Sequence, residues 1–174
     1  MFAPDSADAS LTLGRCMGLG VAASSGRYVA KVDDDNYYGR HYLRDLLDAF
    51  EPSGAQVVGK WAHYVWLRSS GAGVLRNRWA ENRPERLVQG GSMVVERDLL
   101  DQVPFSDLPR AVDTDLLNRV QQAGAVTYSA DRFGFVSIRG TDRHSHTWPI
   151  ADTALMNRSG SLAFFGDPRA HVEV

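Results

Sequence analysis

Apolar residues recur along most of the chain at spacings that switch between a helical and an extended period. Helical spacing, mostly ended by glycine- or proline-containing segments, predicts helices over residues 11–22, 43–50, 97–102 and 112–123. Runs rich in valine, tyrosine and tryptophan predict strands over residues 28–32, 55–67, 87–95, 126–128 and 133–138, with 74–76 as the second arm of a hairpin. Residues 79–86 are polar and charged, so we expect an exposed loop there. Helices that alternate with strands predict an α/β domain.

Size and charge narrow the class of protein. The 174 residues, 44% hydrophobic and 23% charged, suit one soluble globular domain over residues 11–174, preceded by a loose polar lead-in over residues 1–10. A net charge of -2 gives no basis for binding nucleic acid, and a single cysteine excludes an internal disulfide. No apolar run approaches the roughly 20 residues that span a bilayer, and the N-terminus lacks the layout of a signal peptide. We therefore expect a cytoplasmic protein, and a peripheral membrane association stays open.

Three consecutive carboxylates, Asp33, Asp34 and Asp35, follow the predicted strand over residues 28–32. Carboxylates this close repel one another, so they either stay in water or receive a compensating cation. Mg2+ and Mn2+ prefer oxygen ligands, often one or two carboxylates together with the phosphate oxygens of a substrate. The run is therefore a candidate for holding a metal ion against a diphosphate at the carboxyl end of a strand. A solvated acidic turn is the alternative, because aspartate, asparagine and glycine all favour turns.

Three segments, over residues 26–35, 90–94 and 112–119, give the chain a resemblance to the inverting family 2 nucleotide-sugar glycosyltransferases of GT-A fold. The first is Gly26-Arg27-Tyr28-Val29-Ala30-Lys31-Val32-Asp33-Asp34-Asp35, which resembles the family's approach to its Asp-x-Asp motif. The second is Gly90-Gly91-Ser92-Met93-Val94, and the third is Val112-Asp113-Thr114-Asp115-Leu116-Leu117-Asn118-Arg119, where Val112 replaces a glutamate of the family pattern. The resemblance runs from residue 11 to residue 148 and implies a mixed sheet flanked by helices.

The same resemblance implies that part of the fold is missing. Family members begin with a strand, a helix and a second strand that bind the nucleotide base, and we find no segment here that matches them. The family's frequent Arg-Asn pair, in the helix before the Asp-x-Asp strand, falls at Met17 and Gly18. We therefore expect an N-terminally truncated, GT-A-like domain.

On the donor side, the resemblance implies that Asp35 ligates Mn2+ or Mg2+ and that Asp33 contacts the donor ribose or a metal-bound water. Asp34 belongs to the same donor-binding run, where it sets the turn. His144 and His146 are i, i+2 neighbours, so in an extended segment both point to one side and either can complete the metal sphere, with His146 preferred. The alternative is that both histidines line a surface loop.

On the acceptor side, the resemblance implies that Asp113 is the general base that takes the proton of the acceptor hydroxyl. Aspartate is also a favoured N-cap residue, so a purely capping role for Asp113 is the alternative. Asp115 would bind the acceptor or orient the site, with Arg119 one helical turn later as its partner.

A glycine pair interrupts the predicted strand over residues 87–95. Gly90, Gly91 and Ser92 would let the backbone approach the transferred sugar, with Gln89 as a polar contact. A strand bulge relieved by glycine explains the same residues. Trp61 and other strand aromatics could stack on an acceptor sugar, although such residues more often fill a core. His63 is expected to be structural.

These residues support three hypotheses. The leading one is a metal-dependent, inverting glycosyltransferase that moves a sugar from a UDP- or GDP-sugar to a hydroxyl of a carbohydrate or another acceptor. The second is a catalytically inactive, truncated glycosyltransferase-like binding module. The third is a metal-dependent phosphohydrolase that uses the same carboxylates. Binding of UDP or GDP, and release of phosphate from simple phosphoesters, discriminate among them.

Overall fold

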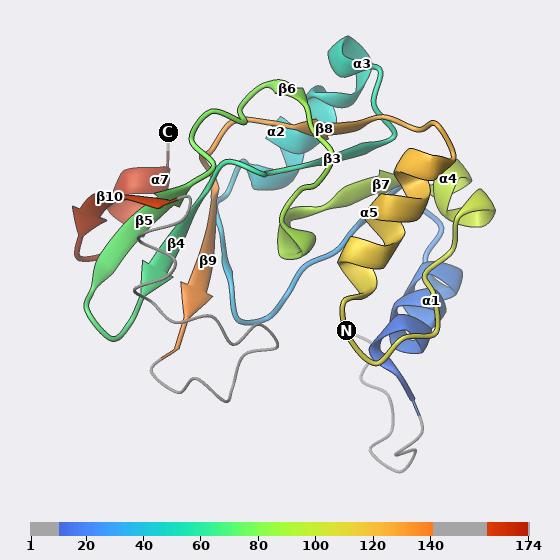
Figure 1. Ribbon diagram of the computed structural model, residues 1–174, viewed down its shortest axis with the longest axis horizontal. Coiled ribbons are helices and arrows are strands. Elements are labelled where there is room, and N and C mark those ends of the chain that lie inside the picture. Colours follow the sequence, from blue (N-terminus) through green and yellow to red (C-terminus); the bar gives the residue numbers. More distant parts are fainter. Residues whose placement is uncertain (1–10, 141–159, 174) are drawn as a thin grey trace.

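The computed structural model describes residues 11–140 and 160–173, and the predicted α/β class is confirmed within them. Two five-stranded mixed sheets lie next to each other, and the helices gather mainly around the first of them (Figure 1). The helices are α1 (Leu13–Ala23), α2 (Tyr42–Asp48), α3 (Phe50–Ser53), α4 (Arg97–Gln102), α5 (Val112–Gln122) and α7 (Arg169–Val172), with a 3-10 turn, η1, at Gly90–Ser92. Among the described helices, none combines the length and apolar character that crossing a bilayer requires.

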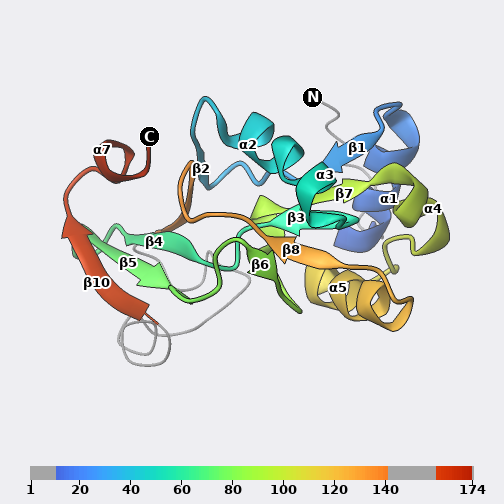
Figure 2. The same cartoon turned by 90° about the horizontal axis from the view of Figure 1, so that it is seen from above.

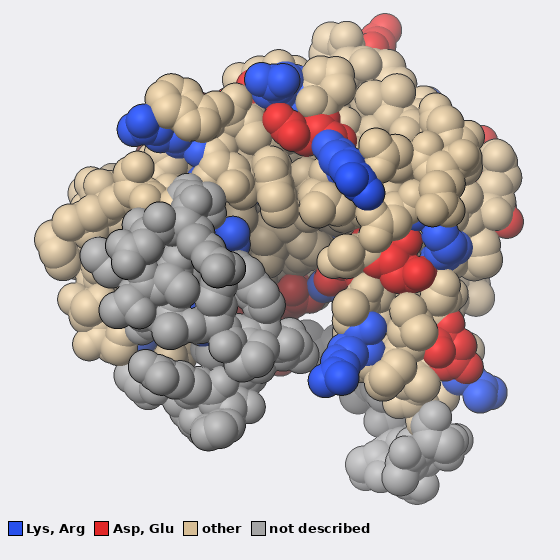
Figure 3. All heavy atoms as spheres, viewed as in Figure 1, with Lys and Arg blue, Asp and Glu red and all other residues tan. Residues whose placement is uncertain are grey.

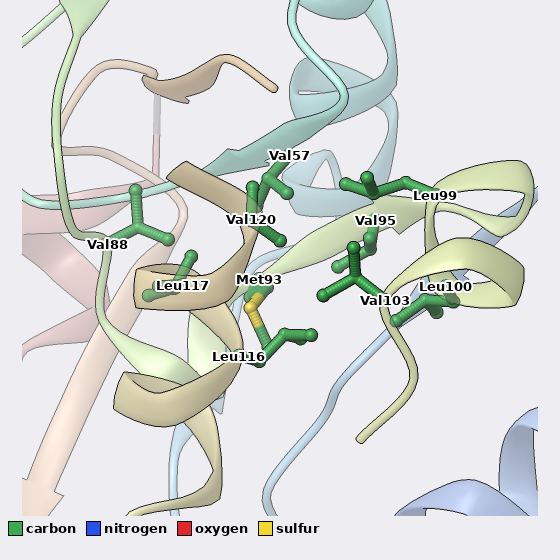
Figure 4. Packing of buried hydrophobic residues seen from close by; sticks show 10 residues of the cluster. All are labelled: Val57, Val88, Met93, Val95, Leu99, Leu100, Val103, Leu116, Leu117 and Val120. Atoms are coloured by element: carbon green, nitrogen blue, oxygen red, sulfur yellow. The ribbon is translucent and has the colours of Figure 1, made fainter. Parts of the chain in front are cut away.

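The first sheet lies between two groups of helices. Its strands, in spatial order, are β1 (Tyr28–Ala30), β7 (Val94–Glu96), β3 (Val57–Gly59), β8 (Thr127–Ser129) and β6 (Arg83–Pro84). Strands β3 and β8 run parallel, and the other neighbours are antiparallel. Because successive residues of a strand face opposite sides, Val57 packs with residues of α4 and α5, whereas Val58 packs with residues of α2. Figure 4 shows the α5 side, where Leu116, Leu117 and Val120 lie over Val57 and Met93.

The second sheet extends away from the first and carries α7 at its far end (Figure 2). Its strands, in spatial order, are β10 (Gly160–Phe165), β5 (Ala72–Arg76), β4 (His63–Leu67), β9 (Phe135–Arg139) and β2 (Tyr37–Tyr38). The hairpin predicted from the sequence is confirmed, because β4 and β5 pair antiparallel with His63 opposite Arg76. Strand β2 follows the acidic run directly, so one short loop connects the two sheets at the aspartates.

The prediction of one strand over residues 55–67 was wrong, since these residues form β3 and β4 in different sheets. The break has a physical cause at Lys60 and Trp61. The Lys60 N–H donates to the Ser92 hydroxyl at 2.9 Å, and the Trp61 N–H donates to the Ser129 hydroxyl at 2.8 Å. Side-chain oxygens thus replace strand carbonyls as acceptors, which ends the ladder of the first sheet without leaving a buried donor unpaired.

The strand predicted over residues 87–95 is also shorter than expected. Residues 90–92 form η1, and the strand begins only at Val94. The Ser92 hydroxyl and the Ser92 N–H both donate to the Gln89 carbonyl, at 2.8 and 2.9 Å, which closes a tight turn around the glycine pair. This turn brings Gly90 and Gly91 to the carboxylates described below.

Candidate functional site

A cavity of about 510 Å³ lies between the second sheet and the start of α5. Strands of the second sheet supply one wall, which includes His63, Arg76 and Arg139. Residues 87–91 and the first turn of α5 supply the opposite wall, together with Asp33. Figure 3 shows this face of the molecule hollowed between its two halves, with acidic and basic atoms visible at the back of the hollow. The sequence-predicted residues that line the cavity are Asp33, Gln89, Gly90, Gly91 and Asp113, together with Trp61 from the aromatic residues considered for acceptor stacking.

One lysine connects the two aspartates that line the cavity. The Lys31 ammonium lies 2.5 Å from Asp33 Oδ1 and 3.6 Å from Asp113 Oδ2. The Lys31 side chain is only 8% exposed, and the two carboxylates are about 30% exposed, at 32% and 28%. Residues far apart in the sequence therefore form one acidic pair around a buried cation.

The two carboxylates lie directly against the backbone of Gly90 and Gly91. A Cβ atom on Gly90 would lie 2.1 Å from Asp113 Oδ2, and one on Gly91 would lie 2.4 Å from Asp33 Oδ2. Neither glycine has a positive φ, so close approach rather than backbone freedom explains both. The expectation was that this backbone approaches a sugar; the structure shows that it approaches the protein's own aspartates.

Asp113 lies in the first turn of α5, but it is not the N-cap. The N-cap is Ala111, a non-glycine residue with φ 57°, and the cap makes no side-chain hydrogen bond. The capping alternative for Asp113 is therefore wrong. Burial raises the pKa of the Asp113 carboxyl most, Asp33 raises it further, and Lys31 opposes both by lowering it. A raised pKa is typical of a carboxylate that exchanges a proton during catalysis.

Two acceptor oxygens at the cavity have no hydrogen-bond partner within the part of the chain that the structure describes. They are Asp113 Oδ1 and Gln89 Oε1, and both are buried. Buried acceptors normally receive a hydrogen bond, because leaving them unpaired costs free energy. Hydroxyl groups of a ligand are donors of the kind that would satisfy both.

Hydrogen bonds from β2 fix the loop that carries Asp33. The Tyr38 hydroxyl donates to the Gly91 carbonyl at 2.7 Å and accepts from the Asp33 N–H at 2.8 Å. Burial raises the pKa of the Tyr38 hydroxyl to about 12, so it stays protonated and keeps both bonds. The Asn36 side-chain oxygen accepts from the Ile138 N–H of β9 at 3.2 Å. The loop is thereby held to the second sheet and, through Tyr38, to η1.

The acidic run divides into two parts. Asp33 faces the cavity, whereas Asp34 and Asp35 are exposed in a turn and do not line it. Within the described residues, no group of three or more His, Cys, Asp or Glu side chains is placed to hold a metal ion. His144 and His146 lie outside the described residues. The exposed oxygens of Asp35 do not form a complete metal site by themselves. A divalent cation that is also bound by a phosphate ligand needs only one or two protein carboxylates, and Asp35 can supply one.

Two predicted residues lie away from the cavity lining. Asp115 forms the predicted i, i+4 ion pair with Arg119, at 2.9 Å, and this pairing is confirmed. A hydrogen bond from Ser106 is the main cause that lowers the pKa of Asp115, followed by Arg119. Ser92 is fully buried, and its hydroxyl binds backbone groups of Lys60 and Gln89. Contacts of Asp115 with an acceptor and of Ser92 with a donor stay predictions.

Sequence reasoning missed Lys31 and the basic wall. A signal for Lys31 existed, because residues i and i+2 of an extended segment point to the same side, which aligns Lys31 with Asp33. Arg76 and Arg139 gave no such signal, because only the pairing of the second sheet brings both to the cavity. Burial lowers the pKa of Arg76 most, and Arg139 lowers it further. His63, expected to be structural, is 1% exposed and lines the cavity, and burial lowers its pKa to about 4. It is therefore a neutral imidazole at neutral pH.

Comparison with known structures identifies the fold. The chain is similar to S. aureus TarS residues 1–349, a glycosyltransferase crystallised in complex with UDP-GlcNAc, with a TM-score of 0.58. The chain has a glycosyltransferase-like fold. The match has 15% sequence identity and covers 82% of this chain but only 43% of that one, so the chain spans less than half of the TarS structure. No family model matches the chain, and no curated protein matches it either. Membership of family 2 and the truncation stay predictions.

Proposed function

We propose that the chain is a glycosyltransferase domain of family 2 type that transfers a sugar from a nucleotide-diphosphate donor to an acceptor hydroxyl. One observation carries the proposal: Asp33 and Asp113 meet around Lys31 on one wall of a cavity of about 510 Å³. The resemblance assigns the first aspartate to the donor and the second to the acceptor proton, and transfer requires both groups at one site. The glycosyltransferase-like fold supports the same assignment.

In the proposed reaction, Asp113 acts as the general base. The acceptor hydroxyl gives its proton to the Asp113 carboxylate while its oxygen forms a bond to the anomeric carbon of the donor sugar. The bond from that carbon to the diphosphate oxygen breaks, and the nucleoside diphosphate leaves. A single displacement of this kind inverts the anomeric configuration. The buried Asp113 Oδ1, which lacks a hydrogen-bond partner in the described structure, is the oxygen available to the hydroxyl.

On the donor side, Asp33 would hold the ribose of the nucleotide, and the resemblance places Asp35 at a Mn2+ or Mg2+ ion. Such an ion neutralises the charge that grows on the leaving diphosphate. Asp35 is exposed beside the cavity-lining Asp33, so it can reach an ion that the diphosphate brings with it. TarS was crystallised with UDP-GlcNAc, so UDP-sugars are the first donors to test.

Release of UDP or GDP is the direct assay. We expect the chain, incubated with UDP-GlcNAc, UDP-glucose or a GDP-sugar, to release the nucleoside diphosphate in the presence of Mn2+, and EDTA to abolish the release. Asp113→Asn should abolish turnover while calorimetry still detects UDP binding. Asp35→Ala should weaken both binding and turnover.

Asp98→Asn is the matched control, because Asp98 is exposed in the first turn of α4 and does not line the cavity. Full turnover in Asp113→Asn would refute the assignment of the base. UDP binding without turnover in the unaltered chain would favour the inactive binding module. Release of phosphate from p-nitrophenyl phosphate would favour the phosphohydrolase.

A further inference from the structure

Lys31 stands out among the charged residues near the cavity because its ammonium lies close to both Asp33 and Asp113. Its side chain is 8% exposed, and its ammonium lies 2.5 Å from Asp33 Oδ1 and 3.6 Å from Asp113 Oδ2. Burying an ammonium costs free energy, and an apolar residue of similar volume often stabilises a fold at least as well. Fold stability alone therefore gives a weak reason for a lysine at this position.

The two carboxylates are held from the opposite side by the glycine pair. Asp33 Oδ2 lies against Gly91 and Asp113 Oδ2 lies against Gly90, each closer than any side chain on the glycine would permit. The ammonium and the glycine backbone thus restrict both carboxylates between them. Lys31 is itself fixed, because its N–H donates to the Met93 carbonyl at 2.9 Å at the end of β1.

Lys31 also supplies a positive charge close to both carboxylates. Two nearby carboxylates resist being ionised together, and both burial and Asp33 raise the pKa of Asp113, whereas Lys31 lowers it. Other charged or titratable side chains also line the cavity: Arg110 beside α5, and Arg76, Arg139 and the neutral His63 from the second sheet. Lys31 forms an ion pair with Asp113.

We propose that Lys31 is a positioning residue whose ammonium, fixed between Asp33 and Asp113, orients the Asp113 carboxylate for proton abstraction. The inference rests on the proposed function, since it assigns Asp113 the role of base. Lys31 acts through Asp113, because its ammonium lies at Asp113 Oδ2 whereas Oδ1 is the oxygen proposed to take the proton, and the same ammonium links Asp113 to Asp33.

Three substitutions at Lys31 test this role. Lys31→Gln removes the charge but keeps a hydrogen-bond donor, Lys31→Met removes both, and Lys31→Arg keeps the charge. We expect kcat to fall about tenfold to a hundredfold in the first two, because misplacing a catalytic group by about 1 Å costs up to that much. The acidic limb of the pH–rate profile should move to higher pH in the same two variants and return towards the wild-type position in Lys31→Arg.

Lys60→Met is the matched control. Lys60 is another buried lysine with an aspartate partner, Asp131 at 3.0 Å, and it does not line the cavity. Its loss should leave kcat and the pH–rate profile unchanged. Thermal melting of all variants separates loss of folding from loss of function, and Lys31→Gln, the smaller change, serves if Lys31→Met does not fold.

Titration of the Asp113 carboxyl carbon by NMR separates failure of this inference from failure of the proposed function. A higher Asp113 pKa in Lys31→Gln, with wild-type transfer activity present and reduced in the variant, supports the inference. Unchanged kcat and an unchanged pH–rate profile in Lys31→Gln would overturn it. If the pKa of Asp113 is higher in Lys31→Gln but the unaltered chain transfers no sugar, the proposed function fails, and the Lys31–Asp113 contact has no role in catalysis. If the pKa of Asp113 is the same in Lys31→Gln and in the wild type, Lys31 has no electrostatic effect on Asp113.

Discussion

Gly90→Ala is a small substitution for which the structure predicts a large loss of activity. The added Cβ would lie 2.1 Å from Asp113 Oδ2 and 2.5 Å from its Cγ. An ordinary contact is about 3.5 Å, so the carboxylate must retreat by about 1 Å or more. A displacement of that size at a catalytic group costs on the order of 10²-fold in rate, which corresponds to about 2.7 kcal/mol in the activation barrier. The backbone at Gly90 does not have a positive φ, so the clash alone acts.

The assay compares kcat and the donor KM for Gly90→Ala, Gly91→Ala and the wild type. We expect Gly90→Ala to lower kcat, because it displaces Asp113, and Gly91→Ala to raise the donor KM, because its Cβ would lie 2.4 Å from Asp33 Oδ2. Gly18→Ala in α1 is the control, since a Cβ there meets nothing within 4 Å. If Gly90→Ala retains wild-type kcat in a folded protein, the close contact between Asp113 and Gly90 has no role in catalysis.

Three further predictions concern stability. Gly14→Ala should lower the free energy of unfolding in urea by about 1–3 kcal/mol, because its Cβ would lie 1.8 Å from the Ser106 carbonyl oxygen, which is backbone. Asp113→Asn should raise the melting temperature near pH 7. The pKa of Asp113 is raised in the folded protein, so the stability that its protonated form provides below the ordinary carboxyl pKa is lost as the pH rises through the folded pKa. Asparagine stays neutral at every pH, so the difference in melting temperature between variant and wild type should disappear near pH 3. Lys60→Met should be neutral or stabilising by up to about 4 kcal/mol in the same urea assay, since Lys60 is fully buried while Asp131 is 41% exposed and can be hydrated; a clear loss of stability would contradict this.

The elements that the sequence predicted correctly are those whose periodicity comes from local burial. Helix α5 shows this well, because Leu116, Leu117 and Val120 recur at helical spacing and all pack on the first sheet. The strand over residues 55–67 failed for the opposite reason. Its apolar pattern continues through Lys60 and Trp61, but the hydrogen-bond acceptors that end β3 are hydroxyls of Ser92 and Ser129, which belong to distant parts of the chain. Local composition carries no signal for such a partner.

The candidate site was predicted in part. Asp33, Gln89, Gly90, Gly91 and Asp113 come from three separate motifs, and the structure brings all five to one cavity. The structure adds a reason for the glycines, because the oxygens of Asp33 and Asp113 lie where a Cβ atom would be; an approach of this backbone to the transferred sugar stays a prediction. A sequence motif shows only that these glycines occur near Ser92 and Met93. The contact between Gly90 and Asp113 depends on how α5 lies against η1, which the motif does not specify.

The buried lysine changes how the acidic run must be understood. From the sequence, either water or a divalent ion held against a diphosphate could compensate the three adjacent carboxylates. Asp33, the partly buried aspartate of the three, instead has its charge compensated by Lys31, while Asp34 and Asp35 remain exposed, where water compensates them. A metal ion is therefore not required to form the Asp33–Asp113 pair, and under the proposed function Asp35 would hold the ion on the donor side. Removing the metal should consequently weaken donor binding and turnover but leave the titration of Asp113 in the donor-free protein unchanged; a shift of that titration on adding Mn2+ alone would show that the ion does enter the pair.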